Sequence, residues 1–127
     1  MSSLSIAILF LTGIGFLGFG AAAALSPTRI AALTQLVLPT PSSRADFAAT
    51  YGGFQLGFGA FLVACTQTQG WVEPGFWAAV AALSGFALIR ILGILRAGGR
   101  VQSAIWIGLA LEVSGAALNL WALQRMY

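Results

Sequence analysis

Four long apolar stretches limit this chain to few folds, because each is about as long as a membrane is thick. A helix crosses the roughly 30 Å hydrocarbon core of a bilayer with about 20 residues. The stretches predicted to do so are residues 4–25, 46–66, 74–95 and 101–123. None of them alternates polar and apolar residues, as a barrel strand does over about ten positions. The sequence therefore predicts an all-α integral membrane protein, folded as a four-helix bundle.

The composition agrees with lipid as the solvent of this chain. Hydrophobic residues make up 59% of the 127 residues and charged residues only 7%, whereas soluble domains carry about 25% charged residues. The length allows one bundle, so we expect a single domain over residues 1–127. No Lys or Arg precedes the first apolar stretch, as a secretory signal would require, so we expect this stretch to be retained as a helix.

A shorter amphipathic segment follows the first span. Pro27 is typical of a first helical turn, and in residues 27–38 the side chains of Ile30, Leu33 and Val37 share one face. The segment is too short to cross the bilayer, so we predict a short interfacial helix that lies along the headgroups.

The connections between spans carry turn and capping signals. Pro39 and Pro41 are expected to end the interfacial helix. Residues 43–46, Ser-Arg-Ala-Asp, have the spacing of a capping box for the second span. RAGGR at 96–100 predicts a tight turn, which would make the last two spans an antiparallel hairpin.

The arginines indicate the orientation of the spans. Six arginines and three acids give a net charge of +3, but no basic face of the kind that nucleic acid requires is predicted, so we expect no nucleic-acid partner. Loops one and three together hold Arg29, Arg44, Arg96 and Arg100, and the opposite side holds Arg125. Because arginine-rich loops stay in the cytoplasm, loops one and three are predicted to be cytoplasmic and both termini periplasmic.

Residue content excludes several kinds of site. The chain has no histidine and one cysteine, Cys65, so we expect neither a metal site nor haem. TGIGFLG at 12–18 matches the GxGxxG spacing of dinucleotide-binding loops, but it lies inside a charge-free span with no acid before Asp46. We interpret these glycines as points of close helix contact.

Small residues recur at helical spacing in the second and fourth spans. Such faces let membrane helices approach closely. The predicted helix-packing residues are Gly53, Gly57, Ala60, Ala64, Gly108 and Gly115.

Polar side chains inside the spans are the candidates for function. Glu112 lies twelve residues after Arg100, which is about 18 Å along a helix and therefore near mid-membrane. An ionisable group there is costly and is by default a functional hypothesis. Arg90, on the neighbouring helix of the hairpin, either extends to the membrane surface or reaches toward Glu112. The full candidate set is Arg90, Glu112, Gln55, Tyr51 and Asn119.

Two interpretations of this set stay open. In the first, which we favour, these groups form a structural network that fixes helix order, because unpaired polar groups are costly in lipid. In the second, they line a cavity for a polar headgroup, or Glu112 binds and releases a proton. One carboxylate without a histidine or an activated nucleophile does not make a catalytic set, so we expect no enzyme.

An apolar span, then YGGFQLGFGAF at 51–61, RILGILRAGG at 90–99 and a mid-span glutamate in LALEVSG resemble the domain-of-unknown-function family 4345. The resemblance covers nearly the whole chain, and one departure from it is Ala97 before the glycines of the last turn, where the family often has an acid. It implies a small four-helix protein of the bacterial inner membrane and supplies no activity. The positions that match the family are Tyr51, Gly52, Gly53, Arg90, Gly93 and Glu112.

The leading functional hypothesis is a non-enzymatic accessory subunit of a larger bacterial membrane complex. Its partners would be membrane lipids and other integral membrane subunits, or further copies in a homo-oligomer. The alternative is binding or transport of a hydrophobic small molecule, such as a quinone, isoprenoid or lipid, in a polar-lined cavity at Arg90 and Glu112. A third hypothesis is proton-coupled transport through Glu112. No cofactor is expected beyond such a bound lipid or quinone.

Overall fold

The computed structural model describes residues 2–127 and is all-α, with no strand among them. Its helices in chain order are α1 (Ser3–Leu25), α2 (Pro27–Ala32), α3 (Pro41–Phe47), the π-helical η1 (Ala48–Gly53), α4 (Phe54–Gln67), α5 (Val72–Arg96) and α6 (Ser103–Gln124). They form two compact units. The central unit is Phe10–Ala64, and the terminal unit joins the residues up to Leu9 with Cys65–Tyr127.

In the described part of the chain, four helices are long and apolar enough to cross a membrane: Ser3–Leu25, Pro41–Gln67, Val72–Arg96 and Ser103–Gln124. This confirms four long apolar helices at the predicted spans, with ends that move by a few residues. Only 11–28% of the most apolar stretch of each span is buried within the chain, so most of each helix lies at the surface of the chain. The assembly of the four spans into one bundle stays a prediction.

The second span begins earlier than predicted, because the helix cap lies at Thr40. Its side chain accepts a hydrogen bond from the Ser43 backbone N–H at 3.0 Å, and the Ser43 side chain accepts one from the Thr40 N–H at 3.0 Å. Pro41 follows in the first turn, where its missing N–H costs nothing. The capping box predicted over residues 43–46 is therefore wrong, and Pro41 begins a helix instead of ending one.

The predicted interfacial helix is shorter than expected. α2 covers only Pro27–Ala32 of residues 27–38. The chain then turns back on itself, with the Leu36 N–H donating to the Ala31 carbonyl at 3.0 Å and Gln35 in the left-handed region at φ 60°. This is the usual helix-ending motif, with glutamine in the position that glycine favours. Beyond it, Leu38 packs in a buried cluster with Ala23, Ala31 and Phe47.

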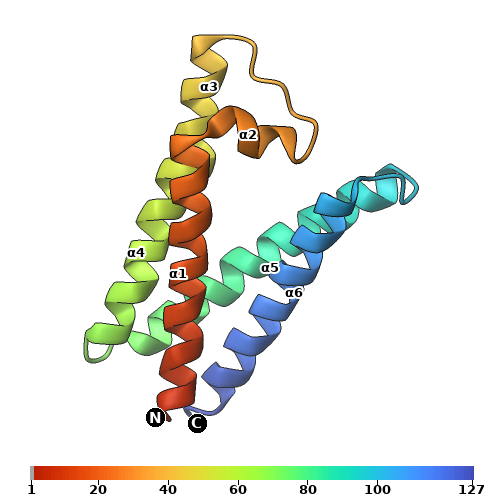
Figure 1. Ribbon diagram of the computed structural model, residues 1–127. Coiled ribbons are helices and arrows are strands. Elements are labelled where there is room, and N and C mark those ends of the chain that lie inside the picture. The colour runs from red at the N-terminus through yellow and green to blue at the C-terminus, as the bar shows by residue number, and fades with distance from the viewer. Residues whose placement is uncertain (1) are drawn as a thin grey trace. The chain divides into compact units, whose positions relative to one another are not determined.

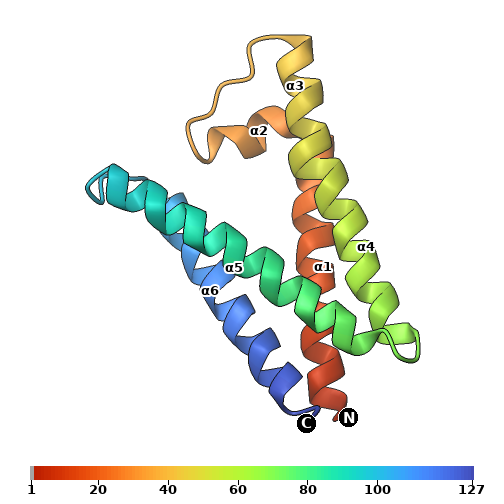
Figure 2. The same ribbon diagram turned by 180° about the vertical axis from the view of Figure 1, so that it is seen from behind.

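Within the central unit α1 runs alongside α4, as both Figure 1 and Figure 2 show. Glycines bring the two backbones together. A Cβ added at Gly59 would lie 2.7 Å from the Gly13 carbonyl oxygen, and one added at Gly20 would lie 2.7 Å from the Leu56 nitrogen. A Cβ at Gly52 would meet Ala24 at 2.8 Å. This glycine contact, made by Gly13, Gly20, Gly52 and Gly59, holds the central unit together.

Within the terminal unit α5 and α6 form an antiparallel hairpin (Figure 1). Gly98 and Gly99 make the turn, with φ of 63° and 78° that other residues rarely adopt. The predicted RAGGR turn is thus present. At the other end of the hairpin Gly75 packs against Cys65 and Leu9, where an added Cβ would lie 2.8 and 2.9 Å from their side chains.

Candidate functional site

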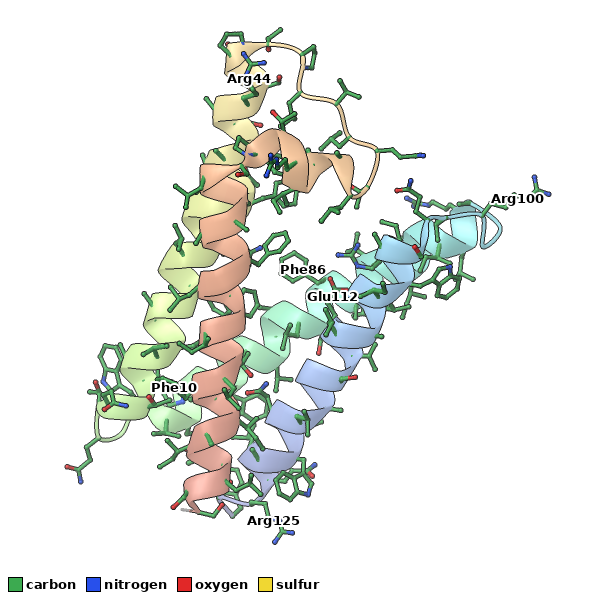
Figure 3. All side chains as sticks on the ribbon, in the orientation of Figure 1. Phe10, Arg44, Phe86, Arg100, Glu112 and Arg125 are labelled. Atoms are coloured by element: carbon green, nitrogen blue, oxygen red, sulfur yellow. The ribbon has the colours of Figure 1, made fainter. Side chains whose placement is uncertain are left out.

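The hairpin brings together Arg90 and Glu112, the charged side chains in the interior of its two helices. Arg90 lies six residues before the end of α5. Glu112 lies near the middle of α6, where Figure 3 labels it. Because the two helices are antiparallel and joined by a short turn, these positions meet across the hairpin. The structure therefore shows Arg90 reaching to Glu112.

The contact between them is a well-formed ion pair. The Arg90 Nε donates to both carboxylate oxygens, at 3.0 Å to Oε1 and 2.9 Å to Oε2, and Nη2 donates to Oε1 at 2.6 Å. The Glu112 side chain is 11% exposed and that of Arg90 28% exposed. Short charge-assisted bonds of this kind are the strong ones. Each charge therefore meets its opposite inside the spans.

Glycine provides the space for this pair. Gly108 lies one turn before Glu112 on α6, and a Cβ there would come 3.2 Å from the Arg90 Cζ. Gly115 lies one turn further along and faces Leu83 of α5. A Cβ added at Gly115 would lie 3.0 Å from the Leu83 Cδ1. Both predicted helix-packing glycines of α6 thus lie at the α5–α6 contact.

Asn119 continues the same stripe of α6. Its side chain is fully buried, and its Nδ2 donates to the Gly115 carbonyl at 2.8 Å. An amide side chain that bonds to its own helix one turn back satisfies a carbonyl within that helix. Asn119 therefore has a bonding partner within α6 and shares its face with Glu112.

Tyr51 and Gln55 belong to the central unit. Tyr51 is 42% exposed and stacks on Phe47, with ring centroids 4.5 Å apart. Gln55 is 6% exposed, and its Cβ lies 3.0 Å from the place of an added Cβ on Gly20. Gln55 thus lies at the glycine contact between α1 and α4. A network joining these two residues to Arg90 and Glu112 stays a prediction.

The predicted small-residue face of the second span is not the one that meets α1. Gly53, Gly57, Ala60 and Ala64 are all exposed, and a Cβ at Gly53 or Gly57 would have open space around it. The α1–α4 contact uses the neighbouring face, with Gly52 and Gly59. We name these four exposed residues the outer face of α4, and their role in helix packing stays a prediction.

Two contacts were not predicted from the sequence: the close approach of α1 to α4 at particular glycines, and a hydrogen bond between the last residue and the start of α5. Of the glycines in TGIGFLG, Gly13 lies in the glycine contact, whereas Gly15 and Gly18 have open space. The signal available was the seven-residue spacing of Gly13 and Gly20, which places both on one helical face. The hydrogen bond from the Tyr127 hydroxyl to Glu73 joins residues 54 positions apart and has no local signal.

The chemistry of this arrangement is that of a closed pair. Arg90 and Glu112 neutralise each other, and Gly108 lies directly against the guanidinium. Within residues 2–127 no three His, Cys, Asp or Glu side chains come together as metal ligands. The pair therefore links α5 to α6 directly, through three hydrogen bonds.

A family model matches nearly the whole chain. No curated protein and no solved structure is found to match the chain. The family model described as "Domain of unknown function (DUF4345)" matches residues 5–123. That range takes in all four spans, the Arg90–Glu112 pair and both glycine-rich contacts. The chain therefore belongs to the DUF4345 family.

Proposed function

We propose that the chain is a non-enzymatic accessory subunit of a larger bacterial membrane complex, and that it docks on other integral membrane subunits through the outer face of α4. The observation that supports this is the openness of Gly53, Gly57, Ala60 and Ala64 within a long apolar helix. In lipid, helices associate through small residues that allow close backbone contact.

The structure of α4 makes this face a good docking surface. Its neighbouring face is already occupied by α1, so the helix is held in place while the outer face stays open. Aromatic side chains flank the seam, with Phe54 63% exposed and Phe61 37% exposed. A partner helix that packs on the outer face of α4 would therefore contact the small residues closely and would also contact the phenylalanine rings beside them.

Ligand binding at the polar pair is less well supported. A headgroup that entered there would have to replace three hydrogen bonds between Arg90 and Glu112. Opening such a pair leaves two charges to be compensated in a medium of low dielectric constant. We therefore assign the pair to the assembly of the hairpin and the docking role to the outer face of α4.

Copurification from the native membrane tests the docking role. We expect the tagged chain, in mild detergent, to retain partner subunits, and Gly57→Leu to reduce their amount at least tenfold, because the added side chain separates the helices. Gly93→Leu on α5 is the matched control, since Gly93 also has open space around it, and it should retain them. A wild-type chain that elutes as a lone monomer would contradict the proposal.

A second, differently tagged copy of the chain identifies the partner class. If the two copies copurify and Gly57→Leu separates them, the outer face joins copies of this chain into a homo-oligomer. If other membrane proteins copurify instead, the face joins a mixed complex.

We further propose that the chain lies in the bacterial inner membrane with loops one and three in the cytoplasm. Four spans that alternate in direction would put loop one, with Arg29 and Arg44, on the same side as loop three, with Arg96 and Arg100, and would leave Arg125 on the other side. In a Cys65→Ser background, an impermeant maleimide added to spheroplasts should label Gln69→Cys and spare Gln35→Cys. The reverse labelling would mean the opposite orientation.

A further inference from the structure

A pocket lies where the start of α1 meets the end of α6, in the terminal unit. Its volume is about 330 Å³, and it is lined by Ser2, Leu4, Trp121 and Arg125. Figure 3 shows Arg125 at the end of α6, opposite to Arg100 at the turn of the hairpin. Because α1 begins at Ser3 and α6 ends at Gln124, the pocket lies at one boundary of the spans.

The charge in this pocket comes from Arg125. Its guanidinium lies over the Trp121 ring, with Cζ 4.8 Å from the ring centroid. Among the residues that the structure describes, no carboxylate pairs with it. Glu73, an acid at the same end of the hairpin, accepts a hydrogen bond from Tyr127 instead. The cation is therefore positioned by an aromatic ring, which leaves its N–H groups available to an anion.

The other lining residues supply a hydroxyl and an apolar wall. Ser2 caps α1, where its Oγ accepts a hydrogen bond from the Ser5 N–H at 3.2 Å, and Leu4 is 59% exposed. Trp71, Trp77 and Trp121 are half-exposed at this end of the unit. Tryptophan gathers at the headgroup level of bilayers, where one part of the ring is apolar and another is wet. The pocket thus has the composition of a headgroup site.

We infer that this pocket binds the headgroup of an anionic phospholipid. Arg125 donates to the phosphate oxygens in the planar geometry that guanidinium offers. Ser2 lies within the same pocket as a hydroxyl partner, and Leu4 and Trp121 contact the glycerol and the upper acyl chain. The volume is at the lower end of ligand pockets, so it holds the phosphate and glycerol while the acyl chains lie along the helices. This inference is independent of the outer face of α4.

Native mass spectrometry of the whole chain in detergent tests this site. The probes are phosphatidylglycerol, phosphatidylcholine and inorganic phosphate, each titrated separately. We expect phosphatidylglycerol to bind at least fivefold tighter than phosphatidylcholine, and Arg125→Gln to weaken it at least fivefold, since one arginine near anionic lipid contributes about that factor. Arg125→Lys should retain part of the binding. Arg100→Gln, which removes an exposed arginine from the other end of the hairpin, should leave it within twofold.

Three results would overturn the inference. Equal loss in the Arg125→Gln and Arg100→Gln variants would show that only net charge matters. Equal binding of the two lipids would show that the site does not select an anionic headgroup. Displacement of phosphatidylglycerol by equimolar inorganic phosphate would assign the pocket to a free anion. A thermal unfolding curve of Arg125→Gln that matches the wild type ensures that the loss of binding reflects the site itself.

Discussion

At the scale of single residues, the Arg90–Glu112 pair joins two opposite charges inside the spans. The Arg90 Nη2 and the Glu112 Oε1 lie 2.6 Å apart, with most of both side chains buried. Removing one of the two charges would leave the other without a partner, which is costly for a buried charge. Sequence predicted the two candidates, because an ionisable residue within a span is rare and visible. Whether Arg90 turned to the surface or to Glu112 could not be predicted, since both positions lie within the reach of a long side chain.

Replacing one partner of this pair should destabilise the protein more than the pair as a whole contributes, because the remaining charge is left unpaired. We expect Glu112→Leu or Arg90→Leu alone to lower the free energy of unfolding by about 2–3 kcal/mol, below the usual range for fully buried pairs because Arg90 is partly exposed. The double variant should lose less than the sum of the two, because no charge is left without a partner. Reversible unfolding in mixed detergent micelles measures this cycle, and additive losses would contradict the coupling.

A single strained residue offers a gain in stability. Gln35 has φ of 60°, a conformation that costs a non-glycine residue about 1–2 kcal/mol. Gln35→Gly should therefore raise the free energy of unfolding by about 1 kcal/mol, after the greater flexibility of glycine in the unfolded chain is subtracted. Gln35→Ala retains the strain and should give no gain. Equal stability of the two variants would argue against strain at this position.

At the scale of helices, the central unit depends on the closeness of α1 and α4. Gly59→Ala places a Cβ 2.7 Å from backbone atoms of α1, which no rotamer change relieves. We expect this variant to lose about 1–3 kcal/mol, the usual cost of an overpacked contact. Gly57→Ala, two residues away on the open face, should be neutral or gain about 0.5–1 kcal/mol from helix propensity. Thermal unfolding of both variants tests the difference.

The second span shows what the sequence can and cannot predict about a helix. Length and hydropathy predicted all four spans, because lipid demands about 20 apolar residues in each. The contact face of the second span was not predictable, since Gly52 and Gly59 recur at helical spacing just as Gly53 and Gly57 do. Periodicity identifies faces without saying which neighbour meets them. The start of the second span was mispredicted for a related reason, because Thr40 and Ser43 are both residue types that cap helices, and the structure has the cap at Thr40.

At the scale of the molecule, the end of the chain is tied to the start of α5 by the Tyr127–Glu73 hydrogen bond. This bond raises the pKa of Tyr127 above its ordinary value of 10.0, chiefly because the phenol donates to Glu73, and also because the carboxylate repels a phenolate. A pKa raised by folding means that the contact contributes stability below pH 10. That contribution is lost as the pH rises through the folded-state pKa of Tyr127.

Absorbance at 295 nm follows this titration. In a Tyr51→Phe background, which leaves Tyr127 as the one tyrosine, the midpoint should lie above pH 10 and fall toward 10 in Glu73→Ala. Glu73→Gln, which removes the charge and keeps an acceptor, should lie between them. A midpoint unchanged by Glu73→Ala would mean that the bond does not persist in solution.

The π-helical segment Ala48–Gly53 has a consequence for how this chain tolerates insertions and deletions. It lies between the capped start of α3 and the glycines that meet α1, within one continuous run of helix. A π turn holds one more residue than an α turn, and each residue turns a helix by about 100°. Because the wide turn already takes up one residue, deleting one residue here would convert the segment to regular helix and leave α4 at nearly the same rotation relative to α3. A one-residue deletion between this segment and Gly59 would instead turn Gly59 by about that angle away from α1, so the π-helical segment is where the second span best tolerates the loss of a residue.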